Sequence, residues 1–172
     1  MWLERTVMLK KFVSSILAIV LLAGCGGKTE GEASQSETPS VSCAEIAADL
    51  VSELNLSDVV SEAKTRTVYG SFFNTREGDE NSPVSDAAAY LPTEKNSDTV
   101  GVFRTDDAET VRTLLEEYLS AQKALSEMYS PEEVFKISNA VVETSEDGKT
   151  VILVVCNDIE DAKAKVQAAL KR

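Results

Sequence analysis

The feature that most limits what this chain can fold into is a short apolar run near its N-terminus. Residues 12–24 are apolar or small, and Arg5, Lys10 and Lys11 precede them. A membrane-spanning helix needs about 20 apolar residues, whereas a secretion signal needs a positive start and an apolar core of about 7–15 residues. We therefore predict that residues 1–24 are a cleaved signal peptide, translated from Met1 or Met8, and lie outside the folded domain.

The end of this run carries a more specific signal. Leu22-Ala23-Gly24-Cys25 resembles the lipoprotein box of bacteria, in which a branched aliphatic residue and two small residues precede a cysteine. The resemblance implies a lipoprotein signal peptide, a diacylglyceryl group on the Cys25 sulfur and cleavage that makes Cys25 the mature N-terminus. Two or more acyl chains hold a protein firmly in a bilayer. We expect a lipid-anchored protein on the extracytoplasmic side of the cell membrane.

The remaining chain divides into a linker and one domain. Residues 25–42 are expected to be the lipidated N-terminus and a flexible linker, because Gly, Ser, Thr and Glu dominate and cannot form a core. Residues 43–172 have the size of a single domain. Removing the signal peptide takes away three basic residues and one acidic residue, which changes the formal charge from −12 to −14. This charge argues against nucleic acid as a partner and against direct binding to anionic lipid.

Hydropathy patterns predict an α+β domain. Amphipathic periodicity indicates four helices, at residues 43–54, 107–129, 131–138 and from 158 onward, and a further helical turn within 57–63. Four strands are indicated, at residues 87–91, 99–104, 140–144 and 151–156. The last strand is continuously apolar, which is typical of a strand covered on both faces. The order α-ββ-α(α)-ββ-α predicts a small antiparallel four-stranded sheet with helices packed on one face. Residues 65–85 show no clear pattern.

Short local motifs set several boundaries. Ser42-Cys43-Ala44-Glu45 and Ser130-Pro131-Glu132-Glu133 both have the spacing of a capping box at a helix start. Asp147-Gly148 predicts a tight hairpin turn, because glycine supplies the positive φ angle. Gly101, inside a predicted strand, indicates either a bulge or a close approach by another group.

An ordered set of motifs also resembles a known family. The set is Tyr90-Leu91-Pro92, Ser97-Asp98-Thr99-Val100-Gly101-Val102-Phe103, Tyr118-Leu119 with Gln122, Tyr129-Ser130-Pro131-Glu132 and Asn139-Ala140-Val141-Val142. It resembles small bacterial lipoproteins, mostly of Gram-positive anaerobes, that carry a C-terminal domain of unknown function. The resemblance covers about residues 86–170 and is weakest at 76–83. It implies an α+β domain outside the cytoplasmic membrane, with no catalytic residues to carry over.

Residues suited to catalysis are few. The chain has no histidine, which removes Ser-His-Asp arrangements and the usual zinc ligand. Carboxylates adjoin at Asp106/Asp107, Glu116/Glu117 and Glu132/Glu133, but neighbours on a helix point about 100° apart and do not form a glycosidase pair. The loop at Asp79-Glu80-Asn81 is expected to be solvated, since it lacks the ligand ladder of a calcium loop.

Two groups of residues allow alternative interpretations. Tyr129, Pro131 and Glu132 are interpreted as a helix-to-helix bend with Tyr129 packed, the alternative being a recognition corner. Cys43 and Cys156 are either separate buried thiols or a disulfide, and geometry decides between them.

These observations favour a binding function. We expect a domain that is not an enzyme, needs no cofactor or metal, and binds an unknown protein or small ligand. The alternatives are a cell-envelope hydrolase that uses carboxylates and a small solute-binding component of a transporter. A buried carboxyl group with a raised pKa in a cleft would favour the hydrolase, and a convex surface would favour protein contact.

Replacing Cys25 with serine tests the lipid anchor. We expect Cys25→Ser to abolish the acyl mass and the cleavage, because the thioether cannot form. When translation begins at Met1, the uncleaved chain keeps Trp2, the only tryptophan, so it shows indole emission that the processed protein lacks. Intact-protein mass spectrometry and fluorescence check both. A native chain without an acyl adduct would contradict the assignment.

Overall fold

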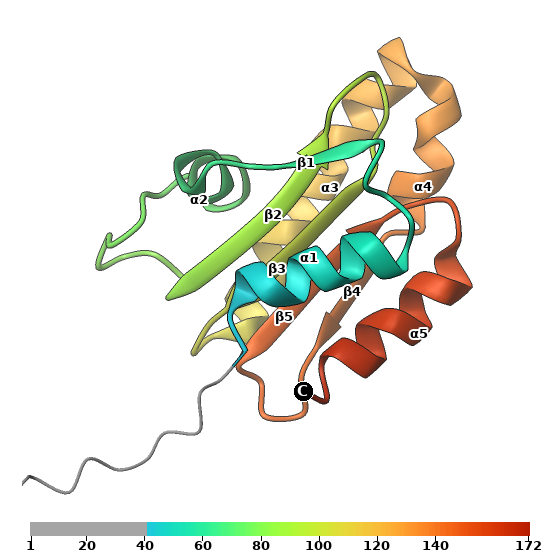
Figure 1. The fold of residues 1–172 in the computed structure, drawn as a ribbon. Helices are drawn as coiled ribbons and strands as arrows, with labels where there is room; N and C mark the ends of the chain where they lie inside the picture. The colour runs from blue at the N-terminus through green and yellow to red at the C-terminus, as the bar shows by residue number, and fades with distance from the viewer. Residues whose placement is uncertain (1–40) are drawn as a thin grey trace, which may run out of the picture. The chain divides into compact units, whose positions relative to one another are not determined.

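The computed structural model describes residues 41–172, and the predicted signal peptide, Cys25 and most of the linker lie outside the described residues. The elements in chain order are α1 (Cys43–Glu53), β1 (Val60–Glu62), α2 (Thr65–Phe73), β2 (Asp86–Pro92), β3 (Thr99–Arg104), α3 (Ala108–Tyr129), a short 3-10 helix η1 (Pro131–Glu133), α4 (Val134–Ser138), β4 (Val141–Thr144), β5 (Thr150–Val155) and α5 (Ile159–Ala169). The domain is α+β, as predicted (Figure 1). No helix within residues 41–172 is both long and apolar enough to span a membrane.

The sheet is antiparallel, as predicted, but has five strands rather than four. Its order is β1-β2-β3-β5-β4. The additional strand is β1, which pairs Val60 with Pro92 and Glu62 with Tyr90 where a helical turn was expected. Three residues at a sheet edge carry too little periodicity to identify a strand, so the pairing with β2 decides the conformation.

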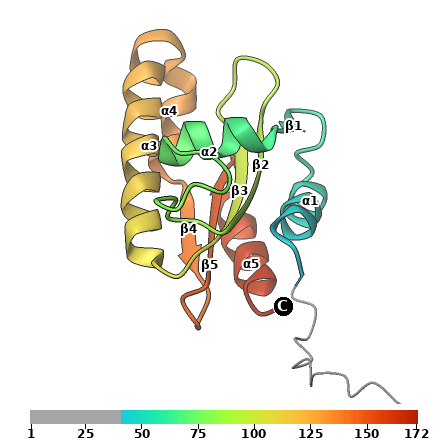
Figure 2. The same cartoon turned by 90° about the vertical axis from the view of Figure 1, so that its left-hand side faces the viewer.

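Helices cover both faces of the sheet, which corrects the expectation of one face. Figure 2 shows α1 and α5 on one side, and α2, α3 and α4 on the other. The reason lies in β5. Ile152 and Val154 pack with α1 and α5, whereas the alternate residues Val151, Leu153 and Val155 pack with α2–α4. Burial of both faces of β5 was predicted correctly, and it requires a helical layer on each side.

An aromatic cluster fills the second layer. The rings of Phe72 and Phe73, from α2, lie with their centroids 5.2 and 5.1 Å from that of Phe103. Gly101 makes room for this ring, because a Cβ there would lie 2.6 Å from Phe103 Cζ. The ladder runs through Gly101 without interruption, paired with Ala89 and Leu153. The glycine therefore marks a close approach and not a bulge.

Of the local turn and cap motifs predicted from the sequence, two are present in the structure and one is not. The capping box at Ser42 is present: its hydroxyl accepts from the Glu45 amide, and the Glu45 carboxylate accepts from the Ser42 amide at 3.0 Å. The hairpin turn is also confirmed, with Gly148 at φ 70°. The Ser130 side chain, by contrast, makes no capping hydrogen bond. Glu133 bonds elsewhere, as described below.

The two cysteines lie at opposite ends of the sheet. The Cys43 amide donates to Asp86, which pairs with Arg104 at the end of β3. Cys156 follows Val155, which pairs with Thr99 at the start of β3. Six strand residues separate these positions by about 17–20 Å, far beyond disulfide reach. Both thiols are free and buried, and burial raises the pKa of Cys43 to about 12.

Substitution of Gly101 tests the aromatic packing. Gly101→Ala should lower the free energy of unfolding by about 1–3 kcal/mol, because the new methyl group overlaps the Phe103 ring. Gly70→Ala is the matched control, since no atom lies within 4 Å of a Cβ there. This control should raise stability by about 0.5–1 kcal/mol through helix propensity. Urea titration followed by circular dichroism measures both, and equal effects would refute the packing argument.

Candidate functional site

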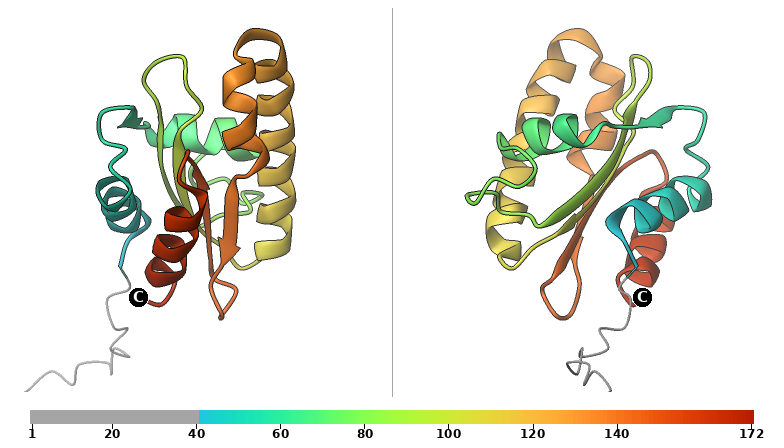
Figure 3. Two further views of the ribbon diagram at one scale, coloured as in Figure 1. Left: turned by 90° about the vertical axis from the view of Figure 1, so that its right-hand side faces the viewer. Right: turned by 60° about the vertical axis from the view of Figure 1, so that its left-hand side comes forward.

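The longest helix extends past the sheet on which it packs. With 22 residues, α3 is about 33 Å long, whereas the six-residue strands β3 and β5 span about 20 Å. Its only fully buried residues are Val111 and Leu115, both in its first half. Near its middle, Tyr118 lines a small cavity together with Thr99 and Val155, the end residues of the two central strands. The last two turns of α3 therefore project beyond the sheet (Figure 3).

The apolar stripe of α3 continues onto this projecting part. Leu125, Met128 and Tyr129 share one helix face at spacings of three and four residues. They are 53%, 71% and 77% exposed, and Phe135 of α4 is 60% exposed. These four are the exposed large apolar side chains of the described residues, and we call them the apolar tip. Because α3 extends beyond the sheet, the sheet offers no surface on which these apolar side chains could pack.

A buried ion network holds this end of the domain together. Lys136 Nζ lies 2.9 Å from Asp98 Oδ2 and 3.0 Å from Glu133 Oε2. The same Glu133 oxygen accepts from the Ser97 amide at 2.8 Å and from its hydroxyl at 2.7 Å. Asp98, Glu133 and Lys136 are all buried. The network thus joins the β2–β3 loop to η1 and α4, just below the apolar tip.

The pKa shifts favour the charged forms of Glu133 and Lys136. Burial opposes ionisation of Glu133, but the hydrogen bonds from Ser97 and Lys136 outweigh it and lower the pKa of Glu133. Burial likewise opposes charge on Lys136, but the bonds to Asp98 and Glu133 raise its pKa. The Lys136 charge is thereby neutralised inside the protein and is not presented at the surface.

The carboxylate pairs singled out in the sequence have different surroundings. Asp106 binds Lys149, and Asp107 caps α3 by accepting from the Thr110 amide. Glu116 and Glu117 are exposed on α3. Glu132 is exposed, whereas its neighbour Glu133 is buried in the network.

Among the described residues, every carboxyl group with a shifted pKa has a pKa below its ordinary value. The pKa values of Glu45, Asp107, Glu133 and Asp147 are lowered, chiefly by hydrogen bonds from amides, hydroxyls or Lys136. The protonated carboxyl group that would favour the hydrolase is therefore not found among them. Residues 41–172 also contain no cluster of three or more potential metal ligands.

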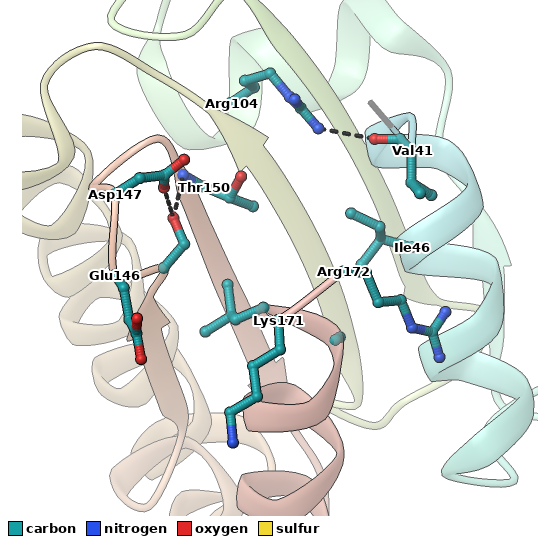
Figure 4. A pocket seen from close by; sticks show the side chains of 11 residues that line it. Val41, Ile46, Arg104, Glu146, Asp147, Thr150, Lys171 and Arg172 are labelled. Carbon is teal, nitrogen blue, oxygen red and sulfur yellow. Dashed lines mark hydrogen bonds between the residues drawn. The ribbon is translucent and has the colours of Figure 1, made fainter. Parts of the chain in front are cut away.

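The largest hollows lie away from the apolar tip. One, of about 450 Å³, lies between α1, α5 and the β4–β5 hairpin (Figure 4). Its cations already have partners: Arg104 donates to the Val41 carbonyl, and Arg172 binds Asp49 and Glu53. Lys171, Glu146 and Asp147 line the same hollow. Its charged lining residues are three bases and two acids, so charges of both signs are mixed there.

Two other hollows also lack the features of a ligand site. A shallow one of about 580 Å³ is bordered by the loop at 78–85, whose Asp79 carboxylate accepts from the Asn81 amide. The cavity beside Tyr118 has about 30 Å³, which is room for roughly one or two waters. It is too small for an organic ligand, so the apolar tip is the candidate site.

Only part of this site was predicted correctly from the sequence. Tyr129 was expected to be packed and is largely exposed, so that interpretation was wrong. The bend itself, with Pro131 at the first position of η1, is confirmed. The network was missed, because Ser97 and Glu133 are 36 residues apart. The one local signal was the spacing of three between Glu133 and Lys136.

The acid dependence of stability tests the network. A carboxyl group whose pKa is lowered by folding stabilises the folded state at pH values above its pKa in the unfolded chain. This stabilisation is lost as the pH falls through its pKa in the folded state. We expect Glu133→Gln to destabilise by about 1–3 kcal/mol at pH 7, with the deficit shrinking below about pH 4.5. Urea titrations across pH 3–7 measure this. Exposed Glu132→Gln should change stability little, and an equal effect would contradict the network.

The sequence matches one described protein family over part of its length. The chain has no significant match among curated proteins or among solved structures. Residues 58–156, more than half of the chain, match the family described as domain of unknown function DUF4358. The match begins just before β1 and ends after β5, so it includes the apolar tip and the ion network but not α1 or α5. The chain belongs to the DUF4358 family.

Proposed function

We propose that this protein is a membrane-anchored extracytoplasmic lipoprotein whose domain binds another protein through the apolar tip and performs no catalysis. The observation that carries the proposal is the projecting part of α3. Soluble domains rarely leave large apolar side chains together at the surface, and such surfaces mark interaction sites. Tyr129, Met128 and Phe135 are also residue types enriched at protein interfaces.

The position of the apolar tip suits an anchored protein. The chain enters the described domain at Val41, whose carbonyl accepts from Arg104 at the C-terminal end of β3. Ser97 and Asp98, which hold the base of the tip, precede the opposite end of β3. The linker therefore joins the domain at the end of β3 opposite the base of the tip, so the point of attachment does not occupy the proposed contact surface.

The shape of the domain weighs against the other functions considered. Solute-binding components of transporters usually close two lobes around a ligand, whereas residues 41–172 form one sheet with two helical layers. Hydrolysis by carboxylates requires an acid that keeps its proton, and the shifted carboxyl groups favour ionisation. Neither alternative has an observation in its favour.

Photocrosslinking in intact cells tests the proposed contact. A p-benzoylphenylalanine residue is placed at Met128 or at Phe135 of the full-length chain in its own host. We expect ultraviolet light to yield a discrete adduct with a second protein from both positions, because both side chains would be covered by it. Mass spectrometry of the adduct measures the crosslink.

Glu116 supplies the matched control. It is exposed on the same helix but lies nine residues or more before the apolar tip, so it should yield no adduct. Equal crosslinking from Glu116 and Met128 would indicate random collision. No adduct from either tip position would refute the function.

A further inference from the structure

The helix that carries Phe135 is too short to hold its own position. It has five residues, and an isolated helix of fewer than about 12 residues is marginal in water, so the contacts of α4 decide where it lies. It packs alongside the C-terminal half of α3 (Figure 3). Its buried residues are Lys136 and Ile137. Because Ile137 borders the cavity of about 30 Å³ beside Tyr118, apolar packing beneath α4 is incomplete.

The polar contacts of this segment are concentrated in the ion network. Within the described residues, every hydrogen bond that a side chain of η1 or α4 makes with the rest of the domain comes from Glu133 or Lys136. The bonds from Ser97 hold Glu133, which precedes α4, whereas Lys136 is the link from within α4 itself. Its Nζ contacts both Asp98 of the loop and Glu133 of η1. Removal of this one cation would leave both carboxylates without a counterion and would free α4 from the loop.

The loop end of the network has anchors of its own. The Asp98 amide donates to Asn96 Oδ1 at 2.9 Å, and Asn96 Nδ2 donates to the Val59 carbonyl at 3.3 Å. Thr93 donates to the same carbonyl from both its amide and its hydroxyl. The β2–β3 loop is thus tied to the start of β1, and α4 is the part whose position depends on the network.

From this arrangement we propose that Lys136 is a positioning residue for the apolar tip. It holds α4 on the β2–β3 loop, so that Phe135 is presented together with the apolar residues at the end of α3. The inference rests on the proposed function and names the residue on which its surface depends. Buried ionic groups specify one arrangement of a segment in some proteins without a gain in stability. Removal of all charges of the network together should therefore displace α4 without unfolding the domain.

Removal of the cation tests this inference in the same cells. The crosslinking residue is placed at Phe135 and combined with Lys136→Met, which keeps an unbranched side chain. We expect the adduct yield to fall about tenfold, because a partner binds only the fraction of molecules in which α4 is in place. Lys149→Met is the matched control, since Lys149 also pairs with a carboxylate, Asp106, but is exposed in the β4–β5 hairpin. It should retain the yield of the parent chain.

A neutral variant separates the position of α4 from the stability of the domain. Asp98→Asn, Glu133→Gln and Lys136→Met together remove every charge of the network and leave no buried charge unpaired. The urea midpoint of this variant at neutral pH should therefore stay close to that of the parent chain. Its adduct yield should nevertheless fall as far as that of Lys136→Met, because the link from within α4 is lost.

Hydrogen exchange supplies a measurement that needs no partner. In both variants the amides of α4 should exchange about tenfold faster than in the parent chain, because local opening exposes them. The amides of β5 should keep their protection, since the sheet does not open with α4. Mass spectrometry of peptides from the two segments measures both rates.

The outcomes separate this inference from the function beneath it. Absence of any adduct from the parent chain refutes the proposed function and with it a role for Lys136 in presenting the tip. A parent adduct that persists in the folded neutral variant refutes only the role of Lys136. The same conclusion follows if Lys149→Met lowers the yield equally. It also follows if the neutral variant unfolds or if β5 loses protection together with α4, because the network would then act on the whole fold.

Discussion

Burial of β5 on both faces is the constraint on which the architecture depends. Every residue of Val151–Val155 is buried, and their side chains alternate between two separate apolar clusters. A helical layer is therefore needed on each side of the sheet. The layer formed by α1 and α5 contacts small aliphatic strand residues such as Val100 and Val102. The layer formed by α2–α4 contacts Phe103, whose ring fits because Gly101 has no side chain.

Most of the fold could be predicted from the sequence because its long elements have strong periodicity. The strands β2–β5 and the helices α1, α3 and α5 lie within a few residues of the predicted ranges. The helix α2 was missed although Val68, Tyr69, Phe72 and Phe73 have helical spacing, because β-branched and aromatic residues also favour strands. The second helical layer could have been inferred, since a strand predicted to be covered on both faces already requires it.

The candidate site was predictable only in part, because its defining features depend on tertiary structure. The apolar stripe of α3 was visible in the sequence, but the sequence does not state where the sheet beneath it ends. Leu125 and Met128 continue the pattern of Val111 and Leu115 and yet have no sheet to cover. Glu133 has the spacing of a capping residue, but the Ser97 amide and hydroxyl offer it two donors that local pattern cannot reveal.

The local rules of stability are followed at three helix starts of this domain and broken around the apolar tip. Ser42, Asp107 and Asp158 all cap their helices with side-chain hydrogen bonds. Around the apolar tip, an acid occupies the last turn of α3, and three charged groups are buried where apolar packing would often be at least as stable. Natural proteins break such rules mainly at functional sites. The clustering of these departures beside exposed apolar side chains therefore supports the proposed binding function.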